Sequence, residues 1–203
     1  MRPPAQPAIR LYSRITIRDA QGHVVKRSRW ALSHSYLKQF VQILRAHMRV
    51  SDESSVLDTG NTSRTLEASI PGAYVLAIST AAGVSTDGLV VGTGSTAVTI
   101  SDYALGTQIA HGVGSGQMEY GTGSIGSAVV SGSTASFTVS RTFTNSSGAS
   151  ITINEVGIYV IATDSAAVSR YFCIVRDVSA TGLPATVLNT QTFTVEFKIS
   201  VTA

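Results

Sequence analysis

The segment at residues 56–63, VLDTGNTS, contains the residue types best suited to chemistry, because Asp58, Thr59 and Gly60 follow two apolar residues. A carboxylate held in a tight loop can activate water for hydrolysis when a second carboxylate shares its proton. The chain holds no second Asp-Thr-Gly, so such a pair would need one loop from each of two subunits. The same residue types are common in a turn after a strand, and we favour the turn.

The Asp58 loop resembles the Asp-Thr-Gly loop of aspartic proteases, which include viral enzymes that pair one loop from each of two subunits. Residues 89–92, LVVG, loosely match the apolar-apolar-Gly segment that these proteases carry later in the chain. The resemblance implies a dimeric aspartic-type protease that uses Asp58. We keep this enzyme as the more distant alternative.

No other set of residues completes a catalytic, cofactor or metal site. No G-x-S-x-G motif accompanies His111, so a serine triad is not predicted. The glycines at 112, 114 and 116 have the wrong spacing for a dinucleotide loop. The remaining histidines, which lack the carboxylate or cysteine neighbours of a metal site, are His23, His34 and His47. We therefore expect a protein that is not an enzyme and that has no cofactor or metal.

The composition favours a surface that is covered in part by partners. Only 13% of the 203 residues are charged, which is low for a monomer that keeps its whole surface in water. The single cysteine, Cys173, cannot form an intramolecular disulfide, and we expect it to lie inward. The N-terminal segment lacks the apolar core of a signal peptide and no run is long enough to span a membrane, so we expect a protein made and kept in a cytosol.

Basic residues concentrate at the start of the chain. Residues 1–50 hold ten Lys or Arg against one acidic residue, a net charge of +9, whereas the remainder carries five bases and eleven acids, a net charge of −6. This polarity suggests a docking arm that meets an acidic neighbour, a nucleic-acid contact, or simply a solvated basic face. The candidate interaction residues of this part are Arg10, Arg14, Arg18, Lys26, Arg27 and Arg29.

Three aromatic residues accompany these bases and could stack on a nucleic acid: Tyr12, Trp30 and Tyr36. Aromatic residues beside a helix belong more often to a core than to a base-stacking surface. We therefore do not expect nucleic acid as a partner.

The first 50 residues predict a basic N-terminal arm, a hairpin and an amphipathic helix. Prolines in residues 3–8, PPAQPA, favour an extended arm, and two β-prone runs around the turn DAQG predict a β-hairpin over residues 9–28. Residues 33–48 predict a helix that Ser33 or Ser35 caps and that ends in basic residues. Its apolar stripe, which must be buried, consists of Leu37, Phe40, Val41, Leu44 and Met48.

Residues 51–203 predict a β-sandwich domain with a glycine-rich loop at residues 103–127 and a short strand at 118–120 within it. Residues 137–143 and 193–201 alternate as two strands, and RYFCIVRDV at 170–178 predicts a buried strand between them. NSSG at 145–148 predicts a hairpin turn, and a change of apolar parity predicts a β-bulge at residues 155–157. The predicted fold class is mainly β, an antiparallel β-sandwich or jelly-roll-like domain with an N-terminal extended arm, a β-hairpin and one α-helix.

The last third of the chain also resembles a known group of proteins. Its motifs are Glu155-Val156-Gly157-Ile158, Arg176 on the next strand, and an alternating strand at residues 194–201. They are similar to motifs in β-domains of virion proteins from tailed bacteriophages, including tail-fibre attachment modules. The resemblance covers about the last 70 residues well and the helix more loosely.

This resemblance implies a structural component of a tailed bacteriophage particle, made in the bacterial host cytoplasm and contacting copies of itself and other virion proteins. The tail or neck is the expected position, as an adaptor or fibre-attachment protein, and a capsid decoration protein on the head surface is the closest alternative. It also implies that Glu155 and Arg176, one on the bulged strand and one on its neighbour, form a partner pair. Neither a small-molecule substrate nor a membrane is an expected partner.

Overall fold

The computed structural model describes residues 8–33, 35–49, 51–67, 74–79 and 81–202, and in these the chain forms fourteen strands and one helix. The fold is mainly β, with antiparallel sheets in a β-sandwich-like arrangement, as the sequence predicts. Most of the proline-rich segment that predicts an arm lies outside the described residues.

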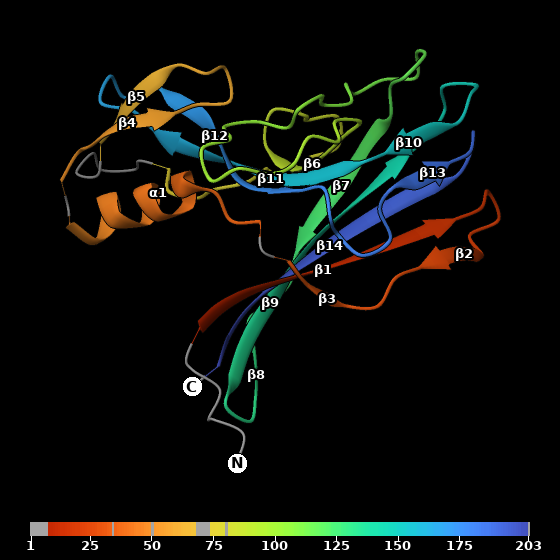
Figure 1. Cartoon of the computed structure of the whole chain (residues 1–203), viewed down its shortest axis with the longest axis horizontal. Coiled ribbons are helices and arrows are strands. Elements are labelled where there is room, and N and C mark those ends of the chain that lie inside the picture. Colours follow the sequence, from red (N-terminus) through yellow and green to blue (C-terminus); the bar gives the residue numbers. More distant parts are fainter. Residues whose placement is uncertain (1–7, 34, 50, 68–73, 80, 203) are drawn as a thin grey trace.

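One large sheet forms the first layer (Figure 1). Its strand order is β2 (Val24–Arg27), β1 (Ala8–Arg18), β14 (Thr192–Thr202), β9 (Thr134–Thr144) and β7 (Glu119–Ile125). In addition, β3 (Ala31–Ser33) pairs with β1, and β8 (Val129–Ser131) pairs with β9. β1 and β14 pair over eleven residues each. The predicted hairpin of residues 9–28 is confirmed as β1 and β2, and it shares one sheet with the C-terminal strand.

Smaller sheets and the helix form the second layer. A three-stranded sheet has the order β12 (Ser169–Asp177), β11 (Glu155–Thr163) and β6 (Gly88–Gly92). Two strand pairs are β4 (Glu53–Leu57) with β5 (Ser63–Leu66), and β10 (Ile151–Ile153) with β13 (Ala185–Val187). The helix, α1 (Lys38–Arg49), packs on β12 and β4. The buried residues of both layers form one continuous apolar core.

Strict alternation gives the large sheet one apolar and one polar face. Residues directly opposite each other in an antiparallel pair share a face, and the register places Ile15 beside Val195 and Ile17 beside Phe193 on the inner face. The predicted alternation of residues 137–143 and 193–201 is thereby confirmed. On the opposite face the same strands present mainly arginines, serines and threonines.

Two strand-pairing predictions were wrong. The segment NSSG does not close a hairpin, because β9 pairs with β14 and β7 while β10 pairs with β13. The buried Asn145 bends the chain there, since its amide group donates to the carbonyls of Ala149 and Val187. The segment RYFCIVRDV lies in the second layer as β12, not between β9 and β14.

Two local predictions also differ from the structure. The parity change after Ile153 arises because the chain leaves one small sheet and enters another at Asn154, and the bulge lies later, between Ile158 and Tyr159. The glycine-rich region contains a longer strand than predicted, because β7 extends through Gly121 and Gly123. A register shift in that strand accommodates the missing side chains.

The helix buries only part of the predicted stripe: Leu37, just before its start, is buried, and Phe40 packs against the core. Gln39, Ile43 and Ala46 are its buried residues, whereas Val41 and Met48 of the predicted stripe are 60% and 77% exposed. Neither predicted cap is at the helix start: Ser33 lies in β3 and donates to Asp177, and α1 begins at Lys38. The helix therefore presents apolar side chains that its own chain does not cover.

Candidate assembly surface

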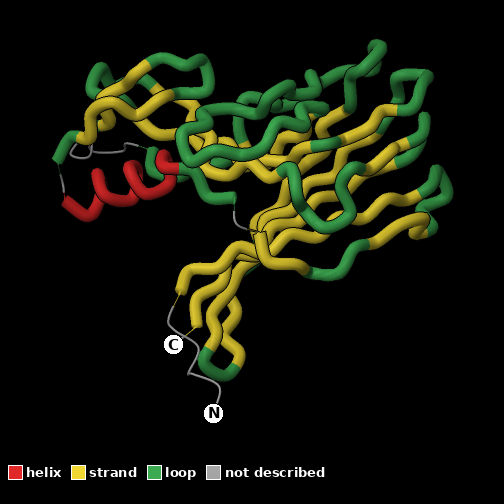
Figure 2. Tube along the Cα trace, viewed as in Figure 1, coloured by secondary structure: helices red, strands yellow, loops and turns green. Residues whose placement is uncertain are grey.

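A stem projects from the body of the molecule (Figures 1 and 2). We define the stem as residues 8–10, 129–136 and 200–202, which are the paired ends of β1, β8, β9 and β14. The first and last described residues, 8 and 202, belong to it. The second layer covers the body of the large sheet, and the stem extends past that cover.

The inner apolar face of the large sheet continues onto the stem, where it is uncovered. One row across the four strands consists of Val130, Ala135, Val201 and Ile9. Of these, Val130 is 74% exposed, Val201 46% and Ile9 51%. Single exposed apolar residues are ordinary, but a contiguous apolar patch marks an interaction surface.

An apolar groove of about 450 Å³ joins this row to the helix. Phe40 and Leu44 of α1 form one wall, and Ile9 and Val201 of the stem belong to the other. Its floor includes residues of both sheets: Ile125, Phe137, Ile158, Val160 and Ile174. The part of the predicted helical stripe that faces this groove is thus available to a partner.

The predicted basic residues divide into a half-buried group, Arg10 and Arg14, and an exposed group. Arg10, Arg14 and Arg18 share the polar face of β1, because every second residue points the same way. Arg14 donates to both carboxylate oxygens of Glu196 at 2.6 Å and lies over the Trp30 ring at 4.4 Å. The Trp30 ring therefore stacks with an arginine of its own chain and needs no nucleic acid as a stacking partner.

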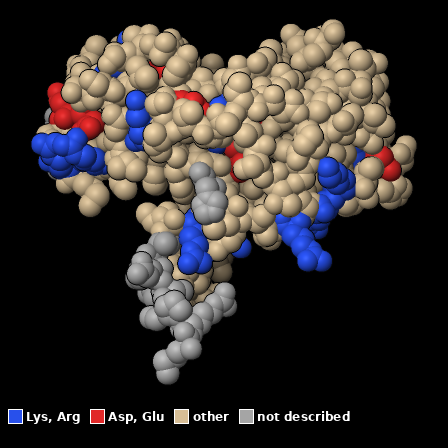
Figure 3. Space-filling model, in the orientation of Figure 1, with Lys and Arg blue, Asp and Glu red and all other residues tan. Residues whose placement is uncertain are grey.

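The exposed group of basic residues covers β2 and the segments beside it. Arg18, Lys26, Arg27 and Arg29 are all exposed, although Lys26 also donates to the carbonyl of Gly182 at 2.8 Å. Figure 3 shows basic side chains over the β1–β2 hairpin and near the end of α1, while most of that face is uncharged. The hairpin is the part of the predicted basic patch that a partner can reach.

Glu155 and Arg176, which the sequence singles out, lie in contact inside the protein. The Arg176 guanidinium donates through Nε to Glu155 at 2.8 Å and through Nη1 to Asp102 at 2.7 Å. Both members of the pair are buried. The Glu155 carboxylate also accepts from the backbone N–H groups of Gly94, Gly106 and Thr107. The pair therefore fastens two loops of its own chain to β11 and β12.

Asp102 completes this ionic cluster from the loop. Burial opposes its ionisation, but hydrogen bonds from Thr99 and the charge of Arg176 outweigh that effect and lower the pKa of the Asp102 carboxyl. A carboxylate with a lowered pKa stabilises the fold above its unfolded-state pKa, near ~3.9, and loses this contribution as the pH falls through the folded-state pKa. The loop anchorage is thus complete at neutral pH.

Asp58 closes the turn between β4 and β5. One carboxylate oxygen accepts from the backbone N–H groups of Gly60 and Thr62, and the other accepts from Arg64 at 2.7 Å. Burial works against ionisation, yet these partners lower the pKa of the Asp58 carboxyl. In a pair of carboxyls that share one proton, the pKa of one carboxyl must be raised, whereas that of Asp58 is lowered.

The turn between β11 and β12 repeats this arrangement. Asp164 accepts from the N–H groups of Ala166 and Val168 and from Arg170 at 2.6 Å. In both turns the Arg follows the Asp by six residues, a spacing that the sequence analysis missed. Asp164 thus makes the same contacts as Asp58 although no Thr-Gly follows it. The geometry of the Asp58 turn is therefore not specific to an Asp-Thr-Gly sequence.

Asp58→Asn and Asp164→Asn are expected to behave alike. Each keeps an oxygen for the backbone N–H groups but loses the partly exposed ion pair, which costs about 1 kcal/mol of unfolding free energy. Urea unfolding at pH 7 measures the loss. The protease alternative instead requires that Asp58→Asn alone abolish peptide hydrolysis, with Asp164→Asn as the matched control.

Arg141 is a buried residue that the sequence analysis did not select. It lies on the apolar face of β9 and donates to the main-chain carbonyls of Gly121 at 2.8 Å and Ala81 at 2.7 Å. Burial lowers the pKa of its guanidinium. Its position between Val139 and Phe143, at the parity of core residues, is the signal that could have identified it. Arg141 ties the loop before β6 to the large sheet.

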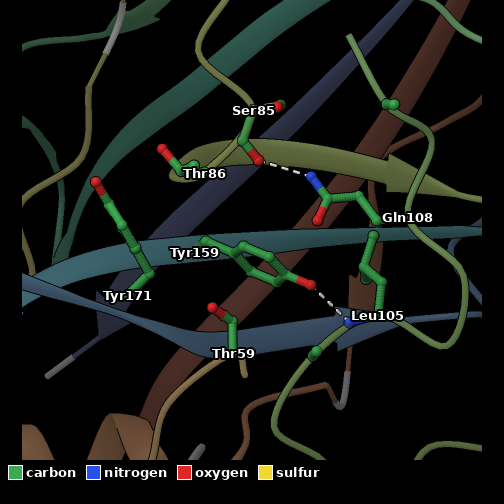
Figure 4. A pocket seen from close by; sticks show the side chains of 9 residues that line it. Thr59, Ser85, Thr86, Leu105, Gln108, Tyr159 and Tyr171 are labelled. Carbon is green, nitrogen blue, oxygen red and sulfur yellow. Dashed lines mark hydrogen bonds between the residues drawn. The ribbon is translucent and has the colours of Figure 1, made fainter. Parts of the chain in front are cut away.

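A second pocket, of about 400 Å³, lies among the loops at the outer side of the three-stranded sheet (Figure 4). Tyr159 accepts from the Leu105 N–H at 2.7 Å, and Gln108 donates to the carbonyl of Ser85 at 2.6 Å. Thr59 and Tyr171 also line it. Its lining side chains offer hydroxyl and amide groups and include no Asp, Glu, Lys, Arg or His.

Comparison with models of known families, with curated proteins and with solved structures finds no match to this chain. Within the described ranges, no helix is long and apolar enough to cross a membrane. Among the same residues, no three His, Cys, Asp or Glu side chains are grouped to hold a metal ion.

Proposed function

We propose that the protein is a non-enzymatic structural subunit that acts through contacts with copies of itself and with other proteins of a large assembly. The observation that carries this proposal is the uncovered apolar face of the stem, where Ile9, Val130 and Val201 stand exposed in one row. Covering that row would remove apolar surface from water at about 25 cal/mol per Å².

The charge distribution supports the same function. Residues 125–140, which include β8 and its turn into β9, contain no charged residue. A solvent-exposed strand edge normally carries charge or proline that prevents association. The absence of charge and proline from residues 125–140 on a projecting stem favours a surface that a partner covers in the assembled protein.

The assembly that we propose is a tailed bacteriophage particle, on the resemblance of the last third of the chain, with the tail or neck as position and the head surface as the alternative. The basic hairpin at β2 would face an acidic neighbour of another kind. The Asp58 loop gives the protease alternative no support, because its carboxylate is fully engaged as a turn residue.

Incorporation into particles tests this function. The double variant Val130→Lys/Val201→Lys is expected to be absent from particles sedimented from an infected lysate, because it places charge on the apolar row. A matched control, Val113→Lys/Val168→Lys, alters two exposed valines outside the stem, the groove and β2 and should be incorporated normally. Deleting residues 1–28 is unsuitable, since it removes β1 from the sheet. Normal incorporation of the stem variant, or a protein never found with particles, would contradict the proposal.

A further inference from the structure

The outer strands of the stem each leave one edge without a strand partner in the described part of the chain. β1 pairs with β3 and β2 only from Leu11 onward, so residues 8–10 pair with β14 alone. β8 pairs with β9 alone. Such edges present unpaired backbone N–H and C=O groups that a further strand can satisfy.

These two edges fit each other. The free part of β1 is residues 8–10, and β8 is also three residues long. Each neighbouring pair across the stem is antiparallel, so β1 and β8, at its two sides, run in opposite directions. Placing one stem beside another in the same orientation therefore sets β1 of one copy antiparallel to β8 of the next.

The rows of side chains are level across the stem. Ser131 stands in the row of Ala8, Val130 in the row of Ile9, and Val129 in the row of Arg10. A rotation without any shift along the strands thus brings the two edges into register. Cyclic assemblies are generated by such a rotation.

We propose that the stems of neighbouring copies of this chain join edge to edge, with β1 of one copy hydrogen-bonded to β8 of the next. This inference rests on the proposed function and specifies its contact. Ile9 lies opposite Val130 and Arg10 opposite Val129, which keeps both apolar side chains on one face of the joined sheet. A slip by one residue would place Ile9 on the polar side.

The contact uses two different edges, so it repeats from copy to copy and closes into a ring when the rotation fits. Three residues of strand pairing bury far less than the roughly 800 Å² per partner of a stable interface. Each copy in a closed ring uses both edges and its apolar row. The area buried per copy is therefore larger than the area of a single contact between two copies. β8 carries no charge, and the one charged residue of the stem, Arg10, lies on the polar face opposite Val129, so the joint places no charge in the apolar row.

Directed cross-linking of the full chain tests the pairing. The variants are Ile9→Cys, Val130→Cys and the double variant, treated with a short bismaleimide and separated under denaturing conditions. The native Cys173 is buried, and burial raises the pKa of its thiol, so the unsubstituted chain is the unreactive control. A second pair, Arg10→Cys and Val129→Cys, examines the same register from the other face.

The expected result is a ladder for the double variant that ends at the number of copies found by light scattering. Mixed single variants should give cross-linked dimers only, and each single variant alone should stay uncross-linked. Dimers from Val130→Cys alone would mean a two-fold contact of β8 with itself and overturn the inference. An oligomer without cross-links in either pair would overturn the pairing but leave the proposed function, whereas a monomer would overturn both.

Discussion

Arg176→Met is expected to lower the free energy of unfolding by about 3–5 kcal/mol, because it leaves a carboxylate buried without its cation. Arg176 and Glu155 are both buried, and Arg176 also holds Asp102 and the carbonyl of Thr96. Its loss should therefore also loosen the loop over residues 94–108. Urea unfolding at neutral pH measures the change.

The control for this prediction is Arg64→Met. Arg64 makes the same kind of contact with Asp58 at 2.7 Å, but its side chain is 25% exposed, so its removal should cost only about 0–1 kcal/mol. Adding Glu155→Gln to Arg176→Met should recover part of the loss, since it removes the unpaired charge. Equal losses for the two arginine variants would show that burial does not govern the Glu155–Arg176 pair.

Val130→Lys/Val201→Lys is expected to convert the assembled protein into a monomer of 21.2 kDa without lowering the stability of its fold. Both valines are exposed in the single chain, so lysine at these positions meets water there. In the joined stems the same lysines would be brought into an apolar row, where an unpaired charge is costly.

Sedimentation velocity measures this change, and thermal unfolding checks the fold. The control variant Val113→Lys/Val168→Lys should sediment like the unsubstituted protein. If the stem variant keeps its full mass, the apolar row is not the contact between copies.

The sequence predicted which faces of the long strands are apolar but not which strands are neighbours. Alternation in residues 137–143 and 193–201 specifies a buried face, and that face is present. A period of two carries no information on the partner strand, so RYFCIVRDV was placed in the wrong sheet and NSSG was interpreted as a hairpin. Pairing between β1 and β14 joins residues that lie far apart in the sequence, from Arg18 with Thr192 to Ala8 with Thr202, which local patterns cannot reveal.

Only parts of the candidate assembly surface could be predicted from the sequence. The helical stripe was recognised, yet the prediction that it must be buried holds only for Leu37 and in part for Phe40, because periodicity identifies an apolar face and not what covers it. Glu155 and Arg176 were selected by a motif, and their contact needed the fold. The stem was missed because two adjacent valines, Val129 and Val130, form no pattern in the sequence, and only the fold shows that β8 extends past the second layer.

The mass of the purified full chain by static light scattering, across a wide range of protein concentration, tests the central claim most directly. We expect one discrete multiple of 21.2 kDa that persists on dilution over part of that range, since a closed ring holds each copy at two edges. A mass of 21.2 kDa at every concentration would contradict assembly through the stem.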